Sequence, residues 1–256
     1  MKPKYPIYVI SKGRFENPLT SKKLSRMKQP HYLVVEPQEY NNYKKTLGEY
    51  ATLLVTPFSN LGLGSIPVRN FVWGHSKENG DNRHWILDDN LANFYFLKNG
   101  KRVLTYDRSI FYYCESFVDK YSNVPMAGMN YMTFAIPHKN IKPFRLNTRV
   151  YSIILLSNKH KIDWRGKYNE DTDLSLRFLK KGYCTILFNA FLADKVATLT
   201  MKGGNEKIYD ETNNRFEFAE SLRRQHPDCV KIVKKWGRYH HSVDYKRFTT
   251  KLIKKK

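Results

Sequence analysis

The chain has 256 residues, with 45 lysines and arginines against 23 acidic residues, so its formal net charge is +22. Hydrophobic residues make up 41% of the sequence and aromatic residues 14%, which is enough for a folded core and excludes a wholly disordered chain. No apolar run approaches the roughly 20 residues that span a bilayer or the length of a signal peptide core, and the charge predicts an acidic partner such as DNA, RNA, an anionic membrane surface or a phosphorylated substrate.

The first part of the chain alternates short β-prone runs with polar segments. Residues 5–10, 31–35 and 51–55 are expected to form strands, and the polar stretch 38–49 is expected to form a helix. The alternation predicts an α/β fold with βαβ units and a mostly parallel central sheet.

Further along, a glycine-rich segment, residues 61–70, leads into a helix expected around residues 71–73. Residues 85–87 are expected to form a short buried strand. Residues 169–181 carry acids at the start, lysines at the end and Gly182 beyond, which predicts a helix, and residues 184–193 predict another strand.

The chain shows no internal repeat and no long low-complexity linker, which predicts one domain over residues 1–220. Residues 221–256 form a basic C-terminal segment that is expected to pack on this domain or to extend from it. The segment holds 12 lysines and arginines and 2 acidic residues, so its net charge is +10. Nearly half of the total charge therefore lies in this segment.

Asp88, Asp89 and Asn90 directly follow the strand expected at residues 85–87. Two adjacent carboxylates repel each other unless a cation or strong donors offset them. A divalent ion, Mg²⁺ or Mn²⁺, bound by Asp88 and Asp89 and by diphosphate oxygens would do so, at the strand ends where open α/β sheets bind ligands. The alternative is a polar turn with acids at a helix N-cap.

A second acidic cluster, Glu170, Asp171 and Asp173, opens the helix expected at residues 169–181. Acids here can simply complement the helix dipole. The functional alternative is a carboxylate base that removes a proton from an acceptor hydroxyl. Together with Asp88 and Asp89, the cluster favours a nucleotide-sugar transferase.

Basic and polar residues lie where strands are expected to give way to helices. Lys12, Arg14, Arg69 and Asn70 could bind the phosphates or the base of a nucleotide, or could simply be solvated. The glycine loop at residues 202–205, with Lys202 and Asn205, could close over a diphosphate or form an ordinary turn.

The basic C-terminal segment interleaves aromatic and cationic residues between Trp236 and His241. Such a mixture can follow a phosphate backbone and stack on bases. The alternative is a solvated basic helix whose tryptophan packs into the core. The residues expected to bind DNA are Arg223, Arg224, Lys234, Lys235, Trp236, Arg238, Lys246 and Arg247.

Three cysteines, Cys114, Cys184 and Cys229, are an odd number without metal-ligand spacing. They predict reduced thiols in an intracellular, cytoplasmic protein.

Four motifs occur in an order that resembles the TET-associated glycosyltransferases, a phage-centred group with the GT-A fold. They are Pro6 to Arg14, Pro67 to Asn70, Trp85 to Asn90 and Tyr168 to Leu174. The resemblance spans roughly residues 5–245. It implies a Rossmann-like sheet that binds a nucleotide sugar, with UDP-glucose favoured, and a divalent metal. The acceptor it implies is the hydroxymethyl group of 5-hydroxymethylcytosine or 5-hydroxymethyluracil in double-stranded DNA, and the location is the cytoplasm of the host cell.

By position, the resemblance places Ser11, Lys12 and Arg14 near the base and ribose of the donor, with Arg69 near the nucleotide. Asp88 and Asp89 take the place of the family's metal-binding acids, although the third position is Asn90. The pair Glu170 and Asp171 matches the acids that supply the base in inverting enzymes, with Asp171 preferred over Glu170.

Three other functions compete with DNA glycosylation. A GT-A enzyme could act on a protein or glycan. A non-catalytic nucleic-acid-binding module would leave the paired acids unexplained, because acids repel phosphate. A metal-dependent nuclease would need more clustered carboxylates than the sequence offers.

Overall fold

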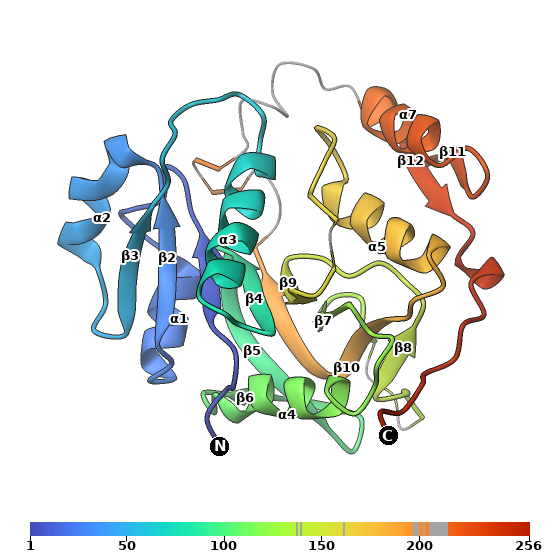
Figure 1. Ribbon diagram of the computed structural model, residues 1–256, viewed down its shortest axis with the longest axis horizontal. Helices are drawn as coiled ribbons and strands as arrows, with labels where there is room; N and C mark the ends of the chain where they lie inside the picture. The colour runs from blue at the N-terminus through green and yellow to red at the C-terminus, as the bar shows by residue number, and fades with distance from the viewer. Residues whose placement is uncertain (137, 139, 161, 197–199, 202, 205–214) are drawn as a thin grey trace.

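The computed structural model describes all residues except 137, 139, 161, 197–199, 202 and 205–214. Among the described residues, ten strands form one central sheet in the order β3-β2-β1-β4-β9-β7-β10-β5-β6, and β8 pairs with β10 (Figure 1). The strands are β1 (Ile7–Ile10), β2 (His31–Val35), β3 (Ala51–Val55), β4 (Arg83–Asp88), β5 (Leu91–Lys98), β6 (Lys101–Thr105), β7 (Met126–Tyr131), β8 (Phe144–Leu146), β9 (Ile153–Ser157) and β10 (Thr185–Lys195).

Helices cover both faces of this sheet, and a separate hairpin lies between the last two of them in the chain. The helices are α1 (Leu19–Arg26), η1 (Pro37–Glu39), α2 (Tyr40–Thr46), α3 (Ile66–Glu78), α4 (Ser109–Val118), α5 (Glu170–Lys180), α7 (Arg215–Gln225) and η2 (Tyr245–Arg247). The hairpin consists of β11 (Val230–Lys235) and β12 (Arg238–Val243).

The parallel sheet predicted from the sequence is present in the half made of β3, β2, β1 and β4. Beyond β4 the sheet is mixed. There β9 runs antiparallel to both of its neighbours, β4 and β7, whereas β7 and β10 run parallel to each other. The predicted α/β fold with a central sheet and flanking helices is confirmed, and it is consistent with a GT-A fold.

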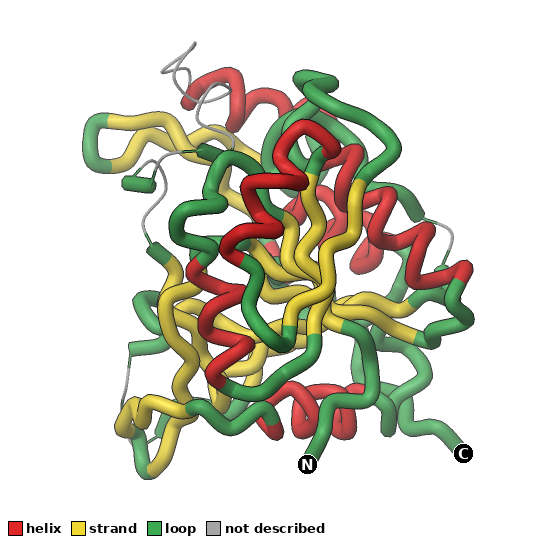
Figure 2. The backbone as a smooth tube through the Cα atoms, turned by 90° about the vertical axis from the view of Figure 1, so that its left-hand side faces the viewer, coloured by secondary structure: helices red, strands yellow, loops and turns green. Residues whose placement is uncertain are grey.

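Alternate side chains of the central strands enter two hydrophobic layers. Ile7 and Val9 of β1 face the layer under α1, α2 and α4, whereas Tyr8 between them faces the layer under α3 and α5. This period of two follows from the pleat of a strand. Figure 2, which looks at the molecule from its β3 side, shows how the sheet twists between these layers.

The C-terminal segment contains a hairpin where the alternative interpretation expected a helix. Its strands join through the two-residue turn Trp236-Gly237, and both turn residues have positive φ, as a type I′ turn requires. Trp236 is 88% exposed, so the expectation that it packs into the core is wrong. The predicted domain boundary at residue 220 lies inside α7.

The base of this hairpin packs against α5 and α7. Leu176 and Leu179 of α5 pack against Leu222 of α7 and Val230 of β11 in a third hydrophobic cluster. The position of the hairpin is therefore coupled to α5, the helix that begins with the second acidic cluster.

All three cysteines are buried as free thiols. Within the described part of the chain, no helix has the length and apolar character needed to cross a membrane.

Candidate active site

A cleft of about 740 Å³ opens between the carboxyl ends of β1, β2 and β4 and the N-terminal ends of α3 and α5. Asp88 and Asp89 of the first acidic cluster and Glu170 and Asp171 of the second line it together. The predicted site residues that line it are Ser11, Lys12, Arg14, Arg69, Asp88, Asp89, Glu170 and Asp171.

Asp88, the last residue of β4, has hydrogen-bond donors on both carboxylate oxygens. Arg69 Nη2 lies 3.0 Å from Oδ1, and Lys195 Nζ lies 2.8 Å from Oδ2, which also accepts a 2.6 Å hydrogen bond from Ser152 Oγ. Burial alone would raise the pKa of Asp88, but Lys195 and Arg69 outweigh it and lower this pKa below its ordinary value. Asp88 is therefore a carboxylate held between two cations.

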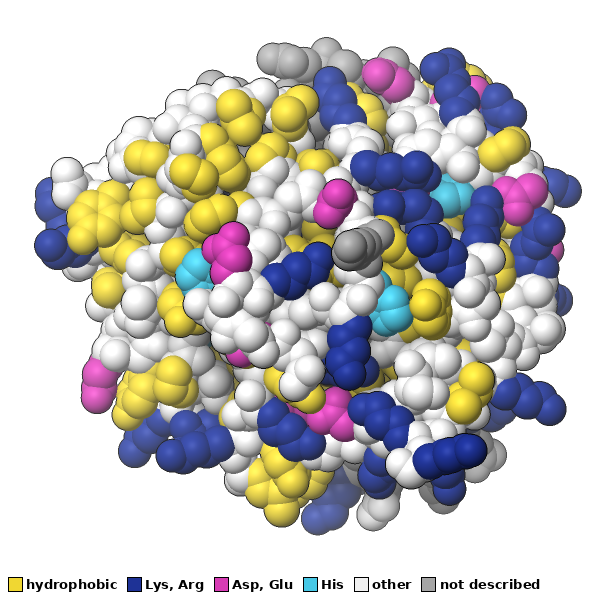
Figure 3. All heavy atoms as spheres, viewed as in Figure 1, with side chains coloured by type: hydrophobic (Ala, Val, Ile, Leu, Met, Phe, Trp, Pro, Cys, Tyr) yellow, Lys and Arg dark blue, Asp and Glu magenta, His cyan; other side chains and the backbone are white. Residues whose placement is uncertain are grey.

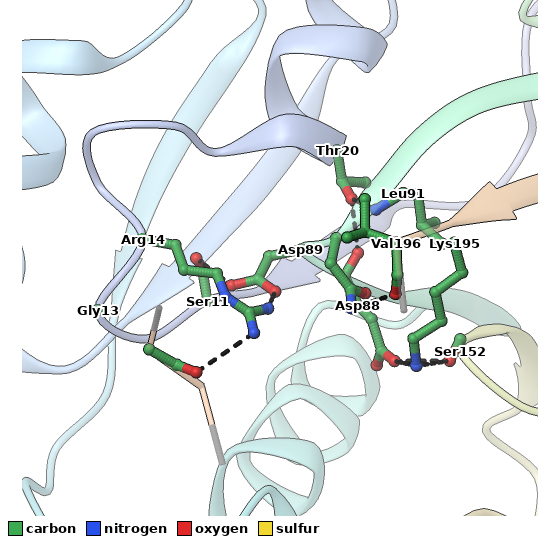
Figure 4. A network of polar contacts seen from close by, with 12 residues as sticks. Ser11, Gly13, Arg14, Thr20, Asp88, Asp89, Leu91, Ser152, Lys195 and Val196 are labelled. Atoms are coloured by element: carbon green, nitrogen blue, oxygen red, sulfur yellow. Dashed lines mark hydrogen bonds and ion pairs between the residues drawn. The ribbon is translucent and has the colours of Figure 1, made fainter. Parts of the chain in front are cut away.

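Asp89 is buried beside Asp88 and also has donors on both oxygens. Arg14 donates to Oδ1, and Ser11 Oγ donates to Oδ2 at 2.6 Å. Figure 4 shows Arg14 reaching Asp89 from one side of the pair and Lys195 reaching Asp88 from the other. Burial raises the pKa of Asp89, although Arg14 and Ser11 act in the opposite direction.

Arg69 connects the two acidic clusters. It lies in the first turn of α3 and is almost fully buried, with its guanidinium over the ring of Trp164 at 4.7 Å. Besides Asp88, it approaches Glu170, with 3.5 Å between Nε and Oε1, and Glu170 accepts a 2.7 Å hydrogen bond from Ser65. The helix begins earlier than the sequence predicted, so Arg69 lies inside α3 rather than before it.

Asp171 stands at the N-terminal end of α5, and its oxygen Oδ1 accepts a 2.7 Å hydrogen bond from the backbone N–H of Thr172. Burial is the main cause that raises the pKa of Asp171 to about 6, and the charges of Glu170 and Asp88 act in the same direction. Arg69 and Lys195 lower it in part. A carboxylate with this pKa is ionised at neutral pH and is a stronger base than an ordinary aspartate.

Asp173, two residues further along α5, belongs to a different environment. Its carboxylate is fully buried and pairs with Arg165, Arg177 and His226. It does not line the cleft. Glu170 and Asp171 thus line the cleft, whereas Asp173 lies in the interior of the protein.

Ser11 and Lys12 extend the site towards the ends of β1 and β2. The Ser11 hydroxyl lies 2.6 Å from that of Tyr43, and Lys12 Nζ lies 2.8 Å from Glu36. Gly13 donates its N–H to Glu39 at 2.7 Å. Glu36 and Glu39 also line the cleft, and the sequence analysis did not single them out.

Asn70 does not join the residues of the cleft. Its side-chain amide donates to the backbone carbonyl of Trp164 at 3.0 Å and accepts from the backbone N–H of the same residue at 2.8 Å. These contacts give Asn70 a structural role in holding the segment before α5. Lys202 and Asn205 lie outside the described residues.

Two further residues of the site, Lys195 and Ser152, lie outside every sequence motif. Lys195 ends β10, where the register against β5 shifts between Asp194 and Lys195; such bulges redirect side chains. Lys195 Nζ lies 2.8 Å from Ser152 Oγ, and the Ser152 hydroxyl is also hydrogen-bonded to that of Tyr131. Nothing near Lys195 in the sequence marks it as part of a site.

On the far side of Asp171, a small polar and aromatic group leads towards the hairpin. The guanidinium of Arg149 lies 5.0 Å from the centre of the Tyr151 ring. Burial is the largest influence on the pKa values of this group: it raises those of Tyr151 and Tyr245 and would lower that of Arg149. The charge of Asp171 raises all three pKa values. Tyr245 follows β12 and packs against the cluster of Leu176, Leu179 and Leu222, so the base of the hairpin lies beside α5.

The residues expected to bind DNA fall into two groups. Lys234, Lys235, Trp236 and Arg238 are exposed at the hairpin tip. The others are exposed or half-buried and, apart from Lys246, lie beside carboxylates: Arg223 and Arg224 pair with Glu220, and Arg247 pairs with Asp228. Figure 3 shows lysines and arginines gathered most densely over α5, α7 and the hairpin.

The residues at Asp88 and Asp89 do not fit a divalent metal in this conformation. All four carboxylate oxygens already accept hydrogen bonds, from Arg69, Lys195, Ser152, Arg14 and Ser11. Among the described residues, no group of three or more His, Cys, Asp or Glu side chains could hold a metal ion. The divalent ion expected from the sequence stays a prediction.

Comparison with known proteins identifies one family. The family described as TET-Associated Glycosyltransferase matches residues 5–204, which include both acidic clusters, Arg69 and Lys195. No curated protein matches the chain. The matched range ends before the hairpin.

Proposed function

The chain belongs to the TET-associated glycosyltransferase family and is therefore a glycosyltransferase, and from this premise we propose that it glycosylates the hydroxymethyl group of a 5-hydroxymethylpyrimidine in double-stranded DNA. UDP-glucose is the favoured donor. The observation that carries the proposal is that a base-like Asp171 faces the cluster of Asp88, Arg69 and Lys195 across one cleft.

In this proposal the nucleotide lies along the carboxyl ends of β1 and β2. Ser11, Lys12 and Arg14 border that end of the cleft, and Arg69 lies at its centre. Lys12 forms an ion pair with Glu36, and Arg14 forms one with Asp89. Both cations therefore hold these acids in position as well as attracting the phosphates of the donor. These ion pairs present both hydrogen-bond donors and hydrogen-bond acceptors to the ribose and base of the nucleotide.

The chemical step needs one base and a stabilised leaving group. The oxygen of the acceptor hydroxyl attacks the anomeric carbon of the sugar while Asp171 takes the hydroxyl proton. The bond from that carbon to the diphosphate breaks, and its electron pair leaves with the diphosphate. Attack from the face opposite the diphosphate inverts the anomeric configuration. Glu170 is the second candidate for the base, but its contacts with Ser65 and Arg69 suit a positioning role.

The basic hairpin supports DNA as the acceptor. Duplex DNA carries a dense line of phosphates, so cations near the acceptor side raise affinity through counterion release. A C5 hydroxymethyl group projects into the major groove, where the thymine methyl lies. Because Tyr245 packs on the cluster that contains Leu176 of α5, the hairpin base lies beside the helix that carries Asp171. DNA held by the hairpin tip would then lie on the acceptor side of the cleft.

The deciding experiment incubates DNA containing 5-hydroxymethylcytosine or 5-hydroxymethyluracil with a panel of nucleotide sugars and analyses the nucleosides by mass spectrometry. A mass increase of one hexose on one of these nucleosides is expected, with UDP-glucose as the best donor. Unmodified DNA is the matched control. Transfer to protein or glycan with none to modified DNA would reject the DNA acceptor and retain the glycosyltransferase.

The rate should depend on pH through Asp171. The group is active when deprotonated, and its pKa is raised to about 6, so kcat/KM is expected to be constant near pH 8 and to fall as the pH drops through 6. One unit below the pKa the decrease is roughly tenfold. A rate that stays constant down to pH 4.5, measured where the protein remains folded, would contradict a base with this pKa.

The hairpin tip should contribute DNA affinity without affecting donor binding. Replacing Lys234, Lys235 and Arg238 together with alanine removes up to three phosphate contacts, so the slope of log K against log salt should flatten by up to about 2.7. The control replaces Lys44 and Lys45 of α2, exposed at the opposite edge of the sheet. Equal salt slopes for the two variants would exclude the hairpin as the DNA contact.

A further inference from the structure

We propose that the ammonium of Lys195 takes the place of a divalent metal ion in this enzyme, so that the donor diphosphate is bound and released without one. The inference rests on the proposed function for its donor, and it concerns a residue that the sequence motifs do not mark.

Two neighbouring buried carboxylates need compensating positive charge. Among the described residues, the side chains of Arg14, Arg69 and Lys195 supply this positive charge. Arg14 meets Asp89, whereas Arg69 and Lys195 meet Asp88 from different directions. A metal is therefore not required to explain why the two acids lie side by side.

Lys195 lies where its ammonium can contact both Asp88 and a ligand in the cleft. Its ammonium lies 2.8 Å from Asp88 Oδ2, and its side chain lines the same cleft as Arg69 and Asp171. Arg69 is shared with Glu170, whereas Lys195 contacts Asp88 without a second carboxylate within ion-pair distance in the described part of the chain. A diphosphate entering the cleft would meet this ammonium between itself and Asp88.

The surroundings fix the ammonium in place. Ser152 Oγ lies 2.8 Å from Nζ, and the ring of Tyr131 lies beneath the ammonium with 5.5 Å to its centre. The β-bulge at the end of β10 directs the side chain inward, and the backbone N–H of Val196 bonds to the carbonyl of Asn90 at 3.0 Å. The strand end is thus tied to the turn that carries both acids, which keeps the cation aligned with them.

The chemical consequence concerns the leaving group. When the bond between the anomeric carbon and the diphosphate breaks, the electron pair and its negative charge go to a phosphate oxygen. Lys195 and Arg69 stabilise that charge directly, while the acceptor proton goes to Asp171. No further reactant is needed for the step to balance. Losing one such preorganised donor costs about 10²–10³ in kcat.

The test compares UDP and uridine binding by calorimetry, on wild-type protein stripped of metal and kept in EDTA. UDP affinity in EDTA is expected to be within twofold of that in Mn²⁺. In Lys195→Met, the Kd for UDP should rise tenfold or more, whereas the Kd for uridine, which has no phosphate, should not change. A merely structural role would weaken both ligands. Lys98→Met, at the exposed end of β5, is the control lysine.

The transfer assay supplies the second arm. Wild-type turnover should survive EDTA, and Lys195→Arg should retain more activity than Lys195→Met. If wild-type protein binds UDP only with Mn²⁺, the inference is wrong although the enzyme still glycosylates DNA. If UDP binds in EDTA through Lys195 but no sugar reaches DNA, the acceptor assignment fails instead. Should Lys195→Met not fold, the EDTA comparison on the wild type decides alone.

Discussion

Replacing Asp171 with asparagine is expected to lower kcat for glycosyl transfer by about 10²–10⁴-fold, the contribution of a positioned general base. The substitution keeps the shape of the side chain and the hydrogen bond from Thr172, but the amide cannot take the acceptor proton. Burial raises the pKa of this carboxyl to about 6, so folding destabilises its ionised form relative to the unfolded chain, although the group is still ionised at neutral pH. The variant should therefore be as stable as the wild type or slightly more stable, and donor binding should persist.

Single-turnover kinetics with hydroxymethylated DNA measure the effect on the chemical step, and calorimetry measures UDP binding by the same samples. Glu170→Gln is the matched variant, because Glu170 is the neighbouring acid and holds Ser65 and Arg69. We expect it to lose much less activity than Asp171→Asn. The reverse order of activities would identify Glu170 as the base.

Asp173→Asn, two residues along the same helix, should act on stability instead. Removing the charge leaves Arg177 and His226 without their buried carboxylate, and breaking one partner of a buried pair costs about 3–5 kcal/mol. The expected result is a reduced free energy of unfolding, measured by denaturant titration. Residual activity of the folded fraction should stay close to that of the wild type.

The stabilisation that the Asp173 carboxylate provides decreases at low pH. Burial alone would raise the pKa of Asp173, but His226 and the two arginines outweigh it and lower this pKa. The stabilising contribution is therefore present at neutral pH and is lost as the pH falls below the ordinary aspartate pKa of about 3.9. Equal unfolding free energies of variant and wild type at pH 7 would refute the structural role.

The local sequence signals predicted the parallel half of the fold well. Strands β1, β2, β3 and β4 and helix α5 were each expected within a few residues, because hydrophobic runs and helix-end residues act over short distances. Residues 91–168 were not assigned. They build β5 to β9 and α4, where antiparallel partners come from distant parts of the chain.

The candidate site was predicted to a similar extent. The motifs located both acidic clusters and Arg69, and the structure brings them into one cleft. Lys195 was missed because it reaches Asp88 across 107 positions of sequence, through a bulge that no local pattern announces. Asn70, also predicted to bind the donor, hydrogen-bonds the backbone of Trp164 and does not line the cleft.

The order of the strands has a consequence for synthesis on the ribosome. Strand β10 is the last strand of the central sheet to be made, yet it lies between β7 and β5 and also pairs with β8. Until it emerges, the β5–β6 hairpin has no strand to join it to the rest of the sheet, and Asp88 lacks the cation at the end of that strand. The release of β10 therefore completes the sheet and at the same time brings Lys195 to Asp88. A nascent chain cannot hold a finished donor site before that point.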